Sequence, residues 1–268
     1  KAKDPKTLNL FKGYRIHNYI HREEIDIQVI LDHIVLLADK NNEVYEYILN
    51  YLAHLIQKPG ERPNVALLFM SKPGTGKNLF WEKFGRTILG AEKVYQTQDI
   101  TRLTNRFNDY LSEKLLVVLD EVEAKTSFNV VEFIKNFITA EQNTIETKNI
   151  RARQEQSYRR LIMFSNNLTP LKIPPKARRF MVTKVADDKI GNKEYFNTLA
   201  EALEDDKLMY CFHEFLYKRD ISKFHAAKDR PITEIYKTLT KSFIPLEAKF
   251  FEYYHSQYID ILSQGDKK

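Results

Sequence analysis

A run of apolar residues that leads directly into a glycine-containing loop is the feature that most constrains how this chain of 268 residues can fold. The run, VALLFM, covers residues 65–70, and the loop, SKPGTGKN, covers residues 71–78. An uninterrupted apolar run of this length is typical of a strand that is buried on both faces of a parallel sheet. The residues after the loop have helical spacing as far as Leu89. The sequence therefore predicts a buried strand, a tight loop and a helix in direct succession.

The loop matches the phosphate-binding pattern GxxxxGK[ST], the P-loop, at its second glycine and its lysine. Gly74 and Gly76 allow the backbone to turn so that successive N–H groups point inward, and Lys77 adds a positive charge for phosphate oxygens. We expect ATP to be bound by Pro73, Gly74, Thr75, Gly76, Lys77 and Asn78. A glycine-containing turn without a ligand is the alternative, and the flanking strand and helix disfavour it.

Two residues of the loop depart from the pattern. Ser71 takes the place of the first glycine, and Asn78 takes the place of the serine or threonine whose hydroxyl usually binds Mg²⁺. An amide oxygen can also bind Mg²⁺, although its reach and geometry differ. We therefore expect Asn78 to be a magnesium ligand, and we expect nucleotide binding to tolerate this change better than fast hydrolysis does.

A second apolar run, LLVVL at residues 115–119, ends at Asp120 and Glu121. This arrangement is typical of a Walker B motif, in which Asp120 would hold Mg²⁺ and Glu121 would act as general base toward the attacking water. Glu123 is a weaker candidate for the base. Because acidic pairs are common at strand ends, this interpretation depends on the P-loop upstream.

Further polar residues follow a third apolar run, LIMF at residues 161–164. The amide of Asn166 could hydrogen-bond the attacking water and the γ-phosphate, or it could simply begin a turn. A Pro-Pro turn then precedes Arg178 and Arg179, which suit an arginine finger that stabilises the transferred phosphoryl group. Two surface arginines beside a strand are the alternative. A finger would act on the ATP of a neighbouring subunit, which implies a ring.

Strands that alternate with helical segments predict an α/β fold of the P-loop NTPase class, with a parallel sheet core flanked by helices. We expect an N-terminal helical, collar-like region at residues 1–60, an ATPase core at residues 61–188 and a C-terminal helical region at residues 189–268. In the last region, helical spacing covers residues 192–217 and 232–262. Because ligands bind at the carboxyl ends of parallel strands, the P-loop, the acidic pair and Asn166 should meet at one site.

The net charge and the cysteine content limit which partners and which cellular compartment the sequence predicts. The formal net charge of +6 permits an anionic partner such as nucleic acid without requiring one. Cys211 is the only cysteine, so an intrachain disulfide is excluded and a reducing cytoplasm is expected. No apolar run approaches the roughly 20 residues of a membrane helix, so we expect no membrane partner. The chain begins without Met or a signal peptide, and we expect it to be part of a longer protein.

The order of these parts resembles the superfamily 3-like, AAA+ type helicase domains of phage and plasmid primase-helicases. The similarity begins with AHLIQKPGERP at residues 53–63 and continues through the P-loop, Asp120 and Glu121, Asn166, and Arg178 and Arg179. Within this group, the chain is most similar to the helicase regions of phage primase-polymerases. The resemblance implies a hexameric ring around DNA, ATP hydrolysis between subunits, 3′-to-5′ unwinding at a replication fork and fusion to an N-terminal primase-polymerase domain.

Such helicases carry a hairpin between the Walker B strand and the next strand, and residues 144–160 occupy that place. Its positive charges are Lys148, Arg151, Arg153, Arg159 and Arg160. The resemblance implies that Lys148, Arg151 and Arg153 contact single-stranded DNA, because cations on a projecting tip follow a phosphate backbone without reading sequence. A solvated connector with ordinary surface charge is the alternative.

We therefore expect an ATP hydrolase coupled to DNA unwinding, the helicase module of a viral or plasmid replication protein, with ATP and Mg²⁺ as cofactors. If the protein is phage-encoded, it would work in the host cytoplasm. Two other functions stay open. A non-catalytic ring scaffold that binds nucleotide and organises a polymerase or primase is favoured by Asn78 and disfavoured by the intact Lys77, Asp120 and Glu121. A loader-type ATPase fits the strand order and the arginines less well.

Overall fold

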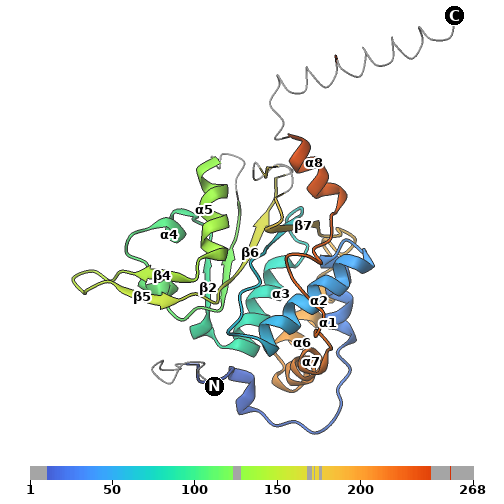
Figure 1. Ribbon diagram of the computed structural model, residues 1–268. Coiled ribbons are helices and arrows are strands. Elements are labelled where there is room, and N and C mark those ends of the chain that lie inside the picture. Colours follow the sequence, from blue (N-terminus) through green and yellow to red (C-terminus); the bar gives the residue numbers. More distant parts are fainter. Residues whose placement is uncertain are drawn as a thin grey trace, which may run out of the picture.

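A five-stranded parallel sheet lies at the centre of the chain (Figure 1). The computed structural model describes residues 11–122, 128–167, 171, 173–174, 177–242 and 254. In order across the sheet, the strands are β2 (Val94–Thr97), β3 (Leu116–Leu119), β6 (Arg160–Ser165), β1 (Ala66–Met70) and β7 (Phe180–Lys184). The three expected strands are thus β1, β3 and β6, and β6 pairs with both of the others.

Helices cover both faces of this sheet. One face packs against α1 (Gln28–Leu37), α2 (Asn42–Gln57), α3 (Lys77–Phe84), α6 (Lys193–Glu204) and α7 (Asp206–Lys218). The other packs against α5 (Phe128–Thr139), α8 (Glu234–Ser242) and the short α4 (Thr101–Thr104). Successive residues of β1 alternate between the two cores, with Leu67 and Phe69 on one side and Leu68 and Met70 on the other. Burial on both faces explains why the run has no polar residue.

Smaller elements complete the chain. Short helical turns are η1 (Arg15–Asn18), η2 (Gly85–Leu89), η3 (Ala91–Lys93) and η4 (Asp109–Leu111). Of these, η2 directly continues α3. A separate antiparallel pair is formed by β4 (Gln142–Ile145) and β5 (Arg153–Gln156).

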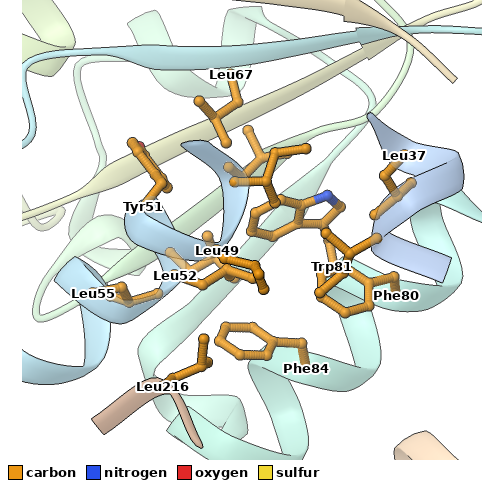
Figure 2. Packing of buried hydrophobic residues seen from close by; sticks show 14 of the residues in the cluster. Leu37, Leu49, Tyr51, Leu52, Leu55, Leu67, Phe80, Trp81, Phe84 and Leu216 are labelled. Atoms are coloured by element: carbon orange, nitrogen blue, oxygen red, sulfur yellow. The ribbon is translucent and has the colours of Figure 1, made fainter. Parts of the chain in front are cut away.

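The helix that follows the P-loop is fixed by aromatic packing. Trp81 of α3 is fully buried, and its ring centroid lies 5.7 Å from that of Phe69 on β1. Figure 2 shows Trp81 surrounded by side chains that include Leu37 of α1 and Leu49 of α2. The start of α3, which ends the phosphate loop, is therefore anchored to the sheet and to the N-terminal helices.

Helices that precede and follow the expected ATPase core share one hydrophobic core. Helices α1 and α2 pack with α6 and α7 over the same sheet face, so the expected divisions at residues 60 and 188 do not separate cores. Helices α6 and α7 cover the stretch expected to be helical at residues 192–217, and the chain breaks between them at Asp205, whose carboxylate caps α7 by accepting from the backbone N of Lys207. Within the stretch expected to be helical at residues 232–262, the structure shows α8, and residues 243–262 other than Tyr254 lie outside the described residues.

A buried arginine binds the carboxyl end of α2. Arg160, the first residue of β6, donates from Nη2 to the carbonyl of Lys58 at 2.8 Å and from Nη1 to the carbonyl of Pro59 at 3.1 Å. These carbonyls lie at the negative end of the helix dipole, which favours a cation there. The expectation that Arg159 and Arg160 belong to an exposed basic segment is wrong, because they are only 4% and 0% exposed.

His54 lies beside this arginine, with Nδ1 3.3 Å from Nη2 of Arg160. Burial and the charges of Arg160, Lys58 and His225 lower the pKa of His54 to about 3. The Glu61 carboxylate is 3.8 Å from Nε2, but it is half exposed and does not offset these effects.

We predict that acid destabilises the fold through His54. The unfolded chain takes up this proton near pH 6.5 and the folded chain only near pH 3. The free energy of unfolding should therefore fall as the pH drops between these values, by up to about 1.4 kcal/mol per pH unit. Urea unfolding at pH 7 and pH 5 measures this, and a His54→Gln variant should show a smaller loss. Equal losses in the two proteins would contradict the assignment.

Candidate nucleotide-binding site

The glycines of the P-loop occupy conformations that only glycine adopts easily. Gly74 has a φ of 84° and Gly76, the N-cap of α3, a φ of 80°. Ser71 does not adopt a left-handed conformation, so glycine is not required at this position. The Oγ of Ser71 accepts a hydrogen bond of 2.9 Å from Oγ1 of Thr75. The replacement of the first glycine therefore leaves the loop geometry intact.

Lys77 points from the start of α3 toward the end of β6. Its side chain is largely buried, and Nζ donates to Oδ1 of Asn166 over 3.0 Å. Burial lowers the pKa of Lys77, while the negative charges of Asp120 and Glu121 act in the opposite direction. The ammonium group thus lies among the polar strand ends, where it could bind a phosphate in place of Asn166.

Asn78 contacts the acidic strand end directly. Its Nδ2 donates to Oδ2 of Asp120 over 2.6 Å, and its Oδ1 is buried without a hydrogen-bond partner. An amide oxygen beside a carboxylate suits Mg²⁺, which takes oxygen ligands and keeps several waters and substrate phosphates. No cluster of three or more His, Cys, Asp or Glu able to hold a metal occurs among the described residues. The residues therefore fit a magnesium ion that phosphates and water help to bind.

Glu121 adopts a left-handed conformation, with a φ of 68°. The residues on either side are held by the sheet: the N of Asp120 donates to the carbonyl of Thr97 on β2, and the N of Val122 donates to the carbonyl of Phe164 on β6. Such a conformation costs on the order of 1 kcal/mol for a residue other than glycine and persists where neighbouring bonds enforce it. Glu121 is thereby turned into solvent at the same sheet edge, whereas Glu123 lies outside the described residues.

The sheet order explains why these groups meet. Because β6 lies between β1 and β3, Asn166 falls between the P-loop and the acidic pair. The register pairs Met70 with Ser165, and the N of Ser71 donates to the carbonyl of Ser165. Three of the expected strand-end groups are thus brought together by parallel pairing.

The two arginines lie elsewhere. Arg178 and Arg179 precede β7, and the carbonyl of Arg179 accepts from the N of Ala66 at the amino end of β1. The length of β1 separates them from the P-loop by about 13 Å, at roughly 3.3 Å per residue. With Arg62 and Glu141 they line a surface depression of about 340 Å³. The structure does not bring them to the phosphate site of their own chain.

The hairpin of β4 and β5 extends away from the sheet (Figure 1). Lys148 and Arg151 are exposed in the loop that joins the two strands. Arg153 lies on β5, where Nη2 donates to Oγ of Ser112 over 2.8 Å. The first two cations are therefore free to contact a ligand at the tip, whereas the third is bound to Ser112.

An exposed aromatic residue beside the hairpin is absent from the sequence predictions. Phe107 is 48% exposed, and the guanidinium of Arg106 lies 5.8 Å from its ring centroid. The next residue, Asn108, fixes this segment to the hairpin by exchanging hydrogen bonds with the backbone of Glu146. The only sequence signal is an aromatic residue between polar ones, which is common in ordinary loops.

Comparisons with known proteins agree with this architecture. A family of unknown function, DUF5906, matches residues 69–179. The DNA primase-polymerase of Nitratiruptor phage NrS-1 is 29% identical over 198 residues, which cover 72% of this chain and 27% of that protein. This chain is similar in sequence to a phage primase-polymerase. Two structures of the NrS-1 C-terminal region align with TM-scores of 0.73 and 0.72 at 23% identity, covering 89% of this chain and 56% of theirs.

These similarities confirm the expected resemblance and the fold. The chain shares the fold of the NrS-1 C-terminal region, an α/β P-loop NTPase core flanked by N-terminal and C-terminal helices. It spans about a quarter of the length of the curated relative. Among the described residues, no helix combines the length and apolar character needed to cross a membrane.

We predict that Lys77→Ala weakens the binding of a fluorescent ATP analogue by about 100-fold or more, because charge-assisted hydrogen bonds to phosphate are lost. Lys72→Ala is the matched control, since Lys72 lies in the same loop but is exposed and pairs with Asp187 at 2.7 Å. A surface pair of this kind contributes little, so the control should change affinity less than about threefold. Equal effects of the two variants would contradict the site.

Proposed function

We propose that this chain is an ATP-driven DNA translocase, the helicase module of a phage or plasmid replication protein that also carries a primase-polymerase domain. The observation that supports it most is the convergence of Lys77, Asn166, Asn78 and Asp120 through two hydrogen bonds at one sheet edge. The chain is similar to part of a DNA primase-polymerase and spans 27% of that protein. This similarity supports the fusion of the helicase module to a primase-polymerase domain.

The site has a residue for each task of phosphoryl transfer to water. Lys77 and the loop N–H groups would bind the β- and γ-phosphates of ATP, and Asp120 and Asn78 would hold Mg²⁺. Bound Mg²⁺ would neutralise charge on the phosphate oxygens. Glu121 would take a proton from the attacking water, and Asn166, once released by Lys77, would orient that water. A base within reach of the water typically contributes about 10²–10⁴-fold to the rate.

The position of the arginines supports hydrolysis between subunits. Because Arg178 and Arg179 lie at the sheet edge opposite to Lys77, they would complete a neighbour's site and not their own. A head-to-tail contact of this kind forms a ring when the rotation between successive subunits closes. The resemblance to superfamily 3-like helicases suggests six subunits.

The hairpin and its aromatic neighbour supply a surface for single-stranded DNA. Lys148 and Arg151 would neutralise phosphates, and Phe107 would stack on a base. The positive net charge of the chain favours the same partner. Movement of this surface between subunits would couple ATP hydrolysis to translocation.

A non-catalytic ring scaffold is the second candidate. It is favoured by Asn78, which supplies no hydroxyl to Mg²⁺ and whose Nδ2 already bonds Asp120. Such a scaffold would bind ATP without turning it over.

We predict that two inactive variants restore activity when mixed. Arg178→Ala/Arg179→Ala should lose about 10³-fold or more in turnover while still binding ATP. Glu121→Gln should bind ATP without hydrolysis, because an amide cannot accept the proton. In an equal mixture, about one interface in four would pair an intact Glu121 with intact arginines in a head-to-tail ring. Steady-state ATPase assays measure the recovery, and no recovery at any ratio would exclude action between subunits.

We also predict separate roles for charge and stacking in DNA binding. Lys148→Glu/Arg151→Glu should weaken single-stranded DNA binding and reduce the salt slope by about 1.4, since each phosphate contact contributes about 0.7. Phe107→Ala should weaken binding about tenfold with an unchanged slope. The charge-matched control is Lys207→Glu/Lys223→Glu, which replaces two exposed cations outside the hairpin. The hairpin would be a plain connector if its variant behaved like the control in fluorescence anisotropy titrations.

A further inference from the structure

Two side chains from outside the P-loop pack directly against the backbone of Gly76. A Cβ added at this glycine would lie 2.6 Å from Cε1 of Phe196 on α6 and 2.8 Å from Cε1 of His33 on α1. These contacts are too close for any side chain, so the loop at Gly76 is backed by α1 and α6. Both helices lie outside the segment that carries the expected phosphate and acidic motifs.

His33 is the polar member of this backing. It is completely buried, and its Nδ1 lies 2.9 Å from the hydroxyl of Tyr195 on α6. Its Nε2 lies 3.3 Å from the place of a Gly76 Cβ and forms no hydrogen bond of normal geometry. If the Tyr195 hydroxyl donates to Nδ1, the ring carries its proton on Nε2, which faces the Gly76 backbone.

The charge state of the ring agrees with this arrangement. Burial lowers the pKa of His33 to about 4, and the Gly76 backbone acts in the opposite direction as an acceptor. Burial also raises the pKa of Tyr195 to about 12, so its hydroxyl keeps the proton that it can donate. Both groups are therefore neutral at pH 7, and a neutral imidazole adds no charge behind the phosphate site.

We propose that His33 is a positioning residue of the phosphate-binding loop. Held by Tyr195, it fixes Gly76 in the left-handed conformation that begins α3 and sets the direction of Lys77. The inference rests on the proposed binding of ATP to this loop, and it connects the loop to α1 and α6. Without His33 or its anchor, the loop must be ordered when the nucleotide binds, so affinity falls.

The test uses Tyr195→Phe, which removes only the anchoring hydroxyl, and His33→Leu, which removes both ring nitrogens. His213→Leu is the matched control, since His213 is a buried histidine on α7, away from the P-loop, whose Nδ1 lies 3.4 Å from the Glu214 carboxylate of the same helix. The affinity for a fluorescent ATP analogue should fall about fivefold in Tyr195→Phe and about tenfold or more in His33→Leu. It should change less than about twofold in His213→Leu, even where the melting temperature falls equally. His33→Gln, which restores a polar group, should recover part of the loss.

A second measurement does not need the nucleotide. Amide hydrogen exchange of residues 74–78 in the free protein should be faster in Tyr195→Phe and His33→Leu and unchanged in His213→Leu, because the loop opens locally. Unchanged exchange and affinity in the first two variants would overturn the proposal and leave His33 as a core residue. If the parent chain bound no ATP, the proposed function would fail, while the exchange rates would still decide whether His33 positions the loop.

Discussion

The parallel pairing of β6 with both β1 and β3 is the constraint on which the candidate site depends. It places Asn166 between the P-loop and the acidic pair, so Lys77 reaches Asn166 and Asn78 reaches Asp120. It also holds Glu121 in a left-handed conformation, because the residue after it bonds to β6. The pairing of β7 with β1 puts Arg179 at the amino end of β1, so it lies away from the phosphate site of its own chain.

Helices α1, α2, α6 and α7 support this site from behind. They form one layer over one sheet face, and they reach the sheet through a buried histidine at Gly76 and a buried arginine at the end of α2. His33 contacts the loop itself, whereas Arg160 ties α2 to the start of the central strand β6. Of these two buried contacts, only that of His33 reaches the phosphate loop.

Much of this architecture can be predicted from the sequence, because the strongest signals are local. Doubly buried strands must be apolar, and a phosphate loop must carry glycine and lysine, so the sequence reveals β1, β3, β6 and their ends. The short strand β2 carries partly exposed residues and gives no such signal. Arg160 looks like a surface charge because sequence does not show that helix carbonyls satisfy it. His33 and Phe107 depend on contacts between distant segments, which no local pattern reports.

ATP hydrolysis measured with and without single-stranded DNA, over a range of protein concentrations, tests the central claim most directly. A ring-forming translocase should turn over ATP at a rate per chain that rises with DNA and with protein concentration. The turnover should disappear in Lys77→Ala. The claim would be contradicted if the chain bound ATP but showed no more turnover than Lys77→Ala under every condition. That result would support a nucleotide-binding scaffold.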